Sequence, residues 1–271
     1  MNDAGRTRSV SARVELQVTE TAELIFAVAV AAEYATASER LAVAIDGEPQ
    51  HVVELSDAHG TRLHRVAAAR PGRLTFDYAA TVDGPAEPGG TSAVDVIRYT
   101  RPSRYAESDA LGPTALAEFG GIDDPAELLA AVSSWVGTHL AYVSGSSLPT
   151  DGAVRTLLSR QGVCRDYAHL TVALLRASGL PARLAAVYAP GLEPMDFHAV
   201  AEAWVDGSWR TVDATTLAPR AALVRIATGR DAADTAFLSV LSGRADLVAV
   251  EVTAVADRLP DDDVTRLVSI V

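Results

Sequence analysis

The chain has 271 residues, 49% of them hydrophobic and 21% charged, which allows one large or two modest domains and excludes long disordered tracts. Its formal net charge is −12, and a field of this sign repels phosphate backbones, so a nucleic-acid partner is disfavoured. The single cysteine excludes an intramolecular disulfide.

The N-terminal residues do not resemble a secretion signal. They are polar and include two arginines, and the apolar run at residues 24–32 is too short to span a membrane. We therefore expect a cytoplasmic protein without a membrane partner; the alternative is a secreted protein whose signal has been removed. All 23 basic residues are arginine, a bias typical of a GC-rich bacterial genome.

The first third of the chain is predicted to form an antiparallel β-sandwich. Short segments rich in Val, Leu and Ile alternate with turn signals such as Asp46-Gly47 and Pro71-Gly72. Several short strands at this spacing favour a sandwich over a parallel sheet. The expected strands cover residues 13–18, 23–30, 40–46, 50–55, 61–67 and 73–82.

Residues 83–90 have the most linker-like composition in the chain, DGPAEPGG. A domain boundary just beyond them predicts a β-sandwich-like domain over residues 1–92 and a second domain over residues 93–271.

The second domain is predicted to contain helices followed by strands. Asp124 can cap a helix whose first position is Pro125. A shorter helix is expected at residues 151–160, and a third begins at Val163 or Cys164 and stops before Pro181. The expected strands cover residues 183–188, 198–205, 208–214 and 245–255. The fold class is therefore α+β.

Cys164 is predicted to lie at the first turn of the third helix. Free N–H groups and the helix dipole favour a thiolate at that position. The helix interior that follows is apolar and should be buried, which would hold the side chain rigidly. The structural alternative is a small buried hydrophobe, which is the usual role of a single cysteine.

His198 and Asp213 are predicted to meet across a hairpin. Asp206-Gly207 is a favoured two-residue turn, and pairing Val205 with Ser208 places Asp213 one diagonal step from His198 on the same face. Diagonal neighbours are about 7–8 Å apart, within reach of a carboxylate and an imidazole. The alternatives are a half-buried strand histidine and a strand-end cap.

His169 is a rival base because it lies five residues after Cys164. At 100° per residue it points about 140° away from the cysteine around the helix. We therefore assign His169 to the polar face of the helix, with Arg165 and Arg176.

Three blocks resemble the transglutaminase-like superfamily, whose core is a papain-like cysteine fold. They are GVCRDYAH at residues 162–169, DFHAVAEAW at residues 196–204 and WRTVDAT at residues 209–215. The order Cys, His, Asp also matches, and the core resemblance extends over about residues 98–240.

The resemblance implies acyl transfer through a thioester, with Cys164 as nucleophile, His198 as proton carrier and Asp213 as its orienting carboxylate. Together with the Cys164 backbone N–H, Tyr142 is a candidate for binding the oxyanion, and Gln161 is a weaker one. The structural alternatives are a packed strand or loop tyrosine and an ordinary loop residue. The substrate would be a peptide, a protein or a small amide, and water or an amine could accept the acyl group.

No cofactor is implied, and one cysteine with scattered histidines predicts no metal site. The alternative class is a non-catalytic protein-interaction module that retains the fold. The oligomeric state is left open.

Overall fold

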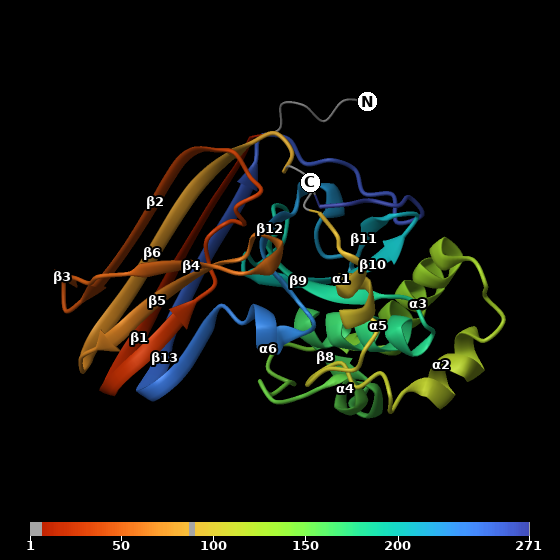
Figure 1. The fold of residues 1–271 in the computed structure, drawn as a ribbon. Helices are drawn as coiled ribbons and strands as arrows, with labels where there is room; N and C mark the ends of the chain where they lie inside the picture. Colours follow the sequence, from red (N-terminus) through yellow and green to blue (C-terminus); the bar gives the residue numbers. More distant parts are fainter. Residues whose placement is uncertain (1–6, 87–89, 271) are drawn as a thin grey trace.

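The computed structural model of the protein describes residues 7–86 and 90–270. Two large antiparallel β-sheets and a group of helices make up the molecule, with the first sheet at one end and the helices at the other (Figure 1). The predicted α+β class, with an antiparallel β region ahead of helices and a second antiparallel sheet, is confirmed.

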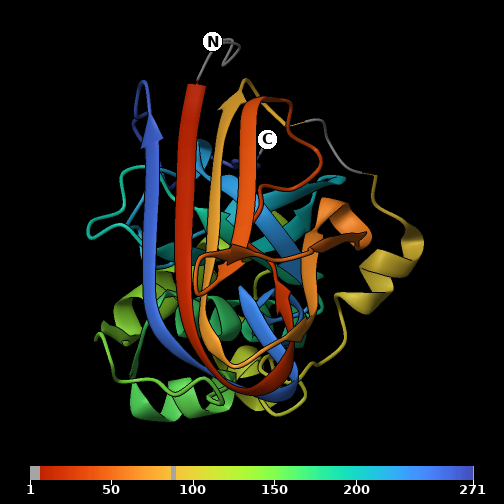
Figure 2. The ribbon, with the colours of Figure 1, turned by 90° about the vertical axis from the view of Figure 1, so that its left-hand side faces the viewer.

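The first sheet is antiparallel throughout, and its long strand β1 is paired along both edges. β13 lies along one edge of β1, whereas β6 and β5 run end to end along the other, beside residues 7–18 and 22–26 (Figure 2). Its strands are β1 (Thr7–Phe26), β2 (Thr36–Ile45), β3 (Glu48–Pro49), β4 (Val53–Ser56), β5 (Arg62–Ala69), β6 (Gly72–Asp83) and β13 (Leu238–Ala256).

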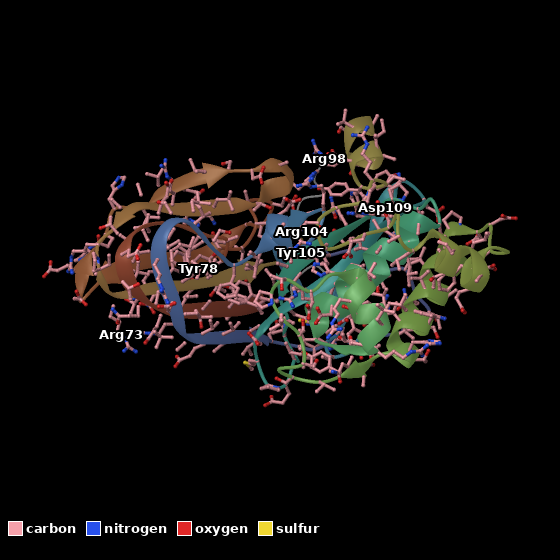
Figure 3. The ribbon with its side chains drawn as sticks, turned by 90° about the horizontal axis from the view of Figure 1, so that it is seen from below. Arg73, Tyr78, Arg98, Arg104, Tyr105 and Asp109 are labelled. Atoms are coloured by element: carbon pink, nitrogen blue, oxygen red, sulfur yellow. The ribbon has the colours of Figure 1, made fainter. Side chains whose placement is uncertain are left out.

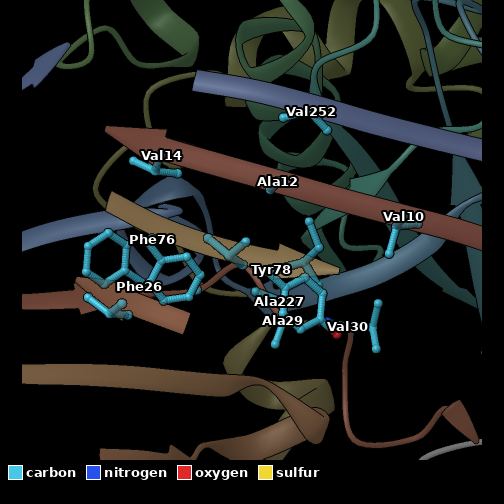
Figure 4. Packing of buried hydrophobic residues seen from close by; sticks show 14 of the residues in the cluster. Val10, Ala12, Val14, Phe26, Ala29, Val30, Phe76, Tyr78, Ala227 and Val252 are labelled. Atoms are coloured by element: carbon cyan, nitrogen blue, oxygen red, sulfur yellow. The ribbon is translucent and has the colours of Figure 1, made fainter. Parts of the chain in front are cut away.

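This sheet folds over on itself. The rings of Phe26 and Phe76 stack with their centroids 4.4 Å apart (Figure 4), although Phe76 pairs with Val14, far from Phe26 along β1. In an unbent strand Val14 and Phe26 would be about 40 Å apart. The two layers predicted for a sandwich are therefore the two halves of one bent sheet. The strand predicted at residues 13–18 lies within β1, and the strand predicted at residues 23–30 overlaps its last four residues.

The end of the chain returns to this first sheet. A strand was predicted at residues 245–255, and it is present as part of β13, paired with β1. In addition, Tyr188 and Val224 of the second sheet belong to the hydrophobic cluster of the first. The division at residue 92 stays a prediction, and residues 87–89 of the predicted linker lie outside the described residues.

The second sheet carries the predicted hairpin. Its strand order is β11-β10-β9-β12, and Val205 pairs with Ser208 through to Ala201 with Val212, which is the predicted register. The strands are β9 (Ala182–Tyr188), β10 (Phe197–Val205), β11 (Ser208–Val212) and β12 (Val224–Gly229). Of these, β12 was not predicted.

α5 packs against the second sheet, α3 reaches the same sheet at β10, and α2 and α4 pack on α5. α5 is almost wholly buried, and its apolar residues form one cluster with Ala201, Ala203 and Val212 of the sheet. α3, α4 and α5 were predicted, whereas the short α1, α2 and α6 were not. The helices are α1 (Ala93–Arg98), α2 (Gly112–Phe119), α3 (Pro125–His139), α4 (Ala153–Ser159), α5 (Cys164–Ala177) and α6 (Ala232–Thr235).

Shorter elements complete the chain: the 3₁₀ turns η1 (Ala58–Gly60) and η2 (Arg220–Ala222), and the parallel pair β7 (Ala141–Tyr142) and β8 (Gln161–Gly162). In the described part of the chain, no helix is both long enough and apolar enough to cross a membrane.

Candidate active site

Cys164 is the first residue of α5, and its thiol is free and partly exposed. Asp166 caps the helix, because its Oδ2 accepts the N–H of Val163 at 2.8 Å. Gly162 permits this close approach, since a Cβ at that position would lie 2.6 Å from the Cβ of Asp166. The backbone on both sides of the thiol is therefore held in place.

The loop that follows β7 is fastened to the same helix start. Ser147 Oγ donates to Asp166 Oδ1 at 2.9 Å, and Arg165 Nη2 donates to Ser147 Oγ at 2.6 Å and to the Leu148 carbonyl at 2.7 Å. These bonds connect residues 147–148 to the segment that carries Cys164.

His198 and Asp213 meet as the hairpin register predicts. The Nε2 of His198 lies 2.8 Å from Oδ2 of Asp213, and the side chains are 1% and 2% exposed. Thr215 donates to Oδ1 of Asp213 from its backbone N–H at 3.0 Å and from its hydroxyl at 2.6 Å. Burial disfavours the Asp213 carboxylate, but His198 and Thr215 outweigh it and hold its pKa below the ordinary value.

The Cys164 side chain interacts with His198. Burial alone would lower the pKa of His198, but the Asp213 carboxylate and then Cys164 outweigh it and raise this pKa above its ordinary value. The buried Nδ1 has no hydrogen-bond partner in the described part of the chain. The ring is therefore held through Nε2 by Asp213, and Nδ1 is not engaged by another hydrogen-bond partner among the described residues.

Tyr142 lies close to the thiol because two segments distant in the sequence pair with each other. The parallel pairing of β7 with β8 sets Tyr142 beside Gly162, two residues before Cys164. Its hydroxyl contacts both the backbone N–H and the thiol of Cys164, and burial together with Cys164 raises the pKa of Tyr142 to about 12. At neutral pH the hydroxyl is protonated and can donate a hydrogen bond.

Gln161 is placed differently from Tyr142. It lies in β8 with an exposed side chain, and within the described residues no hydrogen bond joins that side chain to Cys164 or His198. The structure thus brings together Cys164, His198, Asp213 and Tyr142, and Gln161 lies outside this group.

His169 lies on the side of α5 near Arg165 and Arg176, as predicted, but it is buried rather than solvent-exposed. His169 is 1% exposed; its ring stacks on Tyr105 at 5.4 Å, and its Nε2 accepts the N–H of Ala232 at 3.1 Å. Burial lowers the pKa of His169 to about 3, so the ring is neutral. Segments near Tyr105 (labelled in Figure 3) and Ala232 cover this side of α5, and helical periodicity alone does not reveal such a cover.

β10, the strand that carries His198, also takes part in a buried ionic cluster that the sequence did not predict. Glu202 of β10 has no exposed surface and accepts from Arg183 Nε at 2.7 Å and from two nitrogens of Arg225, both at 2.8 Å. Burial opposes the Glu202 charge, but the two arginines outweigh it and lower the pKa of Glu202 to about 2. The cluster ties β10, which carries His198, to β9 and β12.

Across residues 7–86 and 90–270, no group of three or more His, Cys, Asp or Glu side chains is arranged to hold a metal ion.

A family model matches the segment that contains Cys164, His198 and Asp213. The family model of the transglutaminase-like superfamily matches residues 114–214. An uncharacterized protein of Mycobacterium leprae is 31% identical over 148 residues, which is 49% of this chain and 52% of the relative. An uncharacterized protein of Mycobacterium tuberculosis is 33% identical over 118 residues, which is 43% of this chain and 38% of the relative. The chain thus spans about half or less of the curated relatives it matches.

A solved structure resembles nearly the whole molecule. A protein of Cytophaga hutchinsonii, provisionally described as a cysteine protease, superposes with a TM-score of 0.85 at 34% identity, over 95% of this chain and 92% of that one. This agreement, together with the family match over the segment that contains Cys164, His198 and Asp213, confirms the resemblance found in the sequence. The chain belongs to the transglutaminase-like superfamily, a cysteine-type catalytic family.

Proposed function

We propose that the protein is a cysteine-dependent enzyme that transfers an acyl group from an amide through a thioester on Cys164. One observation carries the proposal: a partly exposed thiol at a helix N-terminus interacts with a buried histidine that is itself bonded to a carboxylate. This arrangement provides an activated nucleophile, a base and the group that orients the base.

The first half of the reaction acylates the enzyme. The Cys164 thiolate attacks the amide carbonyl carbon, and the imidazolium of His198 then protonates the leaving nitrogen as the C–N bond breaks. The amine departs and a thioester remains. Asp213 supports the imidazolium and keeps Nδ1 directed to the reacting atoms.

The second half returns the thiol. Water or an amine loses a proton to the neutral His198 and attacks the thioester carbonyl, and the C–S bond breaks. The products are a carboxylic acid from water or a new amide from an amine, and Cys164 leaves as thiolate beside the imidazolium.

The negative charge that develops on the carbonyl oxygen needs hydrogen-bond donors. The backbone N–H of Cys164 and the protonated hydroxyl of Tyr142 lie together at the thiol. We assign these two donors to the oxyanion, since donors held in place before reaction stabilise the transition state without reorganisation.

The test is a panel of glutamine peptides, other peptide amides and small primary amides, with and without added methylamine. We expect release of the leaving amine in both conditions. The product mass then identifies the acceptor, as acid for water or methylamide for the amine. If no panel member releases its amine in either condition, the proposed reaction is contradicted.

A further inference from the structure

A cavity of about 570 Å³ is lined by Tyr142 and Asp213, two residues of the proposed reaction centre. Its walls are one side of α3, the Tyr142 and Tyr167 rings, residues 212–216 after β11, and residues 264–265 near the end of the chain. This volume falls within the range of about 300–1,000 Å³ that is typical of ligand pockets.

Two residues of the proposed active site line the cavity. Tyr142 lines it while its hydroxyl contacts Cys164, and Asp213 lines it while holding His198. The Tyr142 ring packs 5.9 Å from that of Tyr167, whose hydroxyl donates to the Leu140 carbonyl at 2.8 Å. Cys164 and His198 do not line the cavity, which therefore adjoins the proposed reaction centre through Tyr142 and Asp213.

The walls offer no free charge. Of the lining residues in the described ranges, only Asp213 and Arg220 are charged. Asp213 is bonded to His198 and Thr215, and Arg220 donates to Asp262 at 2.9 and 3.0 Å and to the Asp263 carbonyl at 2.8 Å. A charged substrate group placed there would lose water without gaining an opposite charge, which is unfavourable.

The wall contributed by α3 is formed mainly by small and hydroxyl-bearing side chains, which leave room and supply hydrogen bonds to uncharged groups. They are Ala130, Ser133, Ser134, Gly137 and Thr138.

We propose that this cavity is the subsite for an uncharged segment of the amide substrate, next to the bond that is broken. The proposal rests on the proposed function for its reaction centre. It assigns the substrate class as amides flanked by neutral, small or hydroxyl-bearing groups, and it excludes substrates with a charged side chain at that position.

The substrate arm compares acetyl-Ala-Gln-Ser amide with peptides in which the residue on either side of Gln is replaced in turn by Glu or Lys. We expect kcat/KM to fall about 10- to 100-fold for a charge on the side that enters the cavity. Equal turnover of all the peptides would overturn the proposal.

The protein arm fills the cavity. Ser134→Trp places a large ring on the lining side of α3, and Glu127→Trp, on an exposed position of the same helix that does not line the cavity, is the matched control. We expect Ser134→Trp to lower kcat/KM for the neutral peptide about 10-fold through KM and to leave iodoacetamide labelling of Cys164 unchanged. Equal values for the two variants would overturn the proposal.

A binding measurement distinguishes failure of the proposed subsite from failure of the proposed reaction. In a Cys164→Ala background, calorimetry should show about 10-fold weaker binding of the neutral peptide when Ser134→Trp is added. If this loss is seen but the wild type releases no amine, the subsite stands and the proposed reaction fails. If the wild type turns over but Ser134→Trp behaves like Glu127→Trp, the reaction stands and the subsite fails.

Discussion

Replacing Cys164 by alanine is expected to lower kcat by at least about 10⁴-fold on any amide that the wild type accepts, because removal of a nucleophile leaves only binding and oxyanion contacts. Cys164 is the only cysteine in the chain, so no second thiol can substitute for it. The measurement is leaving-amine release under saturating substrate.

The same substitution should leave the fold intact. The thiol is partly exposed, and the helix start is held by Asp166 rather than by Cys164. Circular dichroism and the urea midpoint of Cys164→Ala should match those of the wild type. Undiminished turnover in the variant would contradict the mechanism and favour the non-catalytic interaction module.

Replacing Glu202 by alanine is expected to lower the free energy of unfolding by about 3–5 kcal/mol, because it leaves two buried guanidinium groups without their carboxylate. Arg183 and Arg225 are 6% and 5% exposed, and both donate to Glu202. Urea denaturation measures the loss. Asp246→Ala is the control: it removes one partner of an exposed pair with Arg244, and its effect should stay below about 1 kcal/mol.

The same carboxylate predicts how stability depends on pH. The folded pKa of Glu202 is about 2, below the ordinary value of about 4.3. A lowered folded pKa contributes stability above the ordinary value, and this contribution is lost as pH falls from about 4 toward 2. Glu202→Gln should weaken that dependence. An unchanged dependence in Glu202→Gln, or an effect of Glu202→Ala as small as that of Asp246→Ala, would contradict this role.

Much of the site could be predicted from the sequence because its key contact is local. The Asp206-Gly207 turn determines the register of β10 with β11, and that register alone brings His198 to Asp213. The start of α5 at Cys164 could also be predicted locally, from the apolar helical residues that follow Cys164.

Contacts between distant segments could not be predicted from local patterns. Alternation along β1 identifies its buried face but not the bend that stacks Phe26 on Phe76. Tyr142 reaches Cys164 through the parallel bridge of β7 with β8.

The burial of Glu202 could not be predicted from local sequence patterns either. A glutamate in a strand suggests an exposed position, yet Glu202 is buried because arginines from β9 and β12 meet it. Pairing between strands far apart in sequence decides that outcome.

The most direct test of the central claim is the rate of iodoacetamide labelling of Cys164 as a function of pH, in the wild type and in His198→Ala. The raised pKa of His198 keeps an imidazolium beside the thiol at neutral pH, and such a neighbour favours the thiolate that reacts with the reagent. We predict that at neutral pH the wild type is labelled faster than His198→Ala, and that raising the pH speeds labelling of the variant more than that of the wild type. Slow labelling of the wild type with the same pH profile as His198→Ala would contradict the pairing of Cys164 with His198.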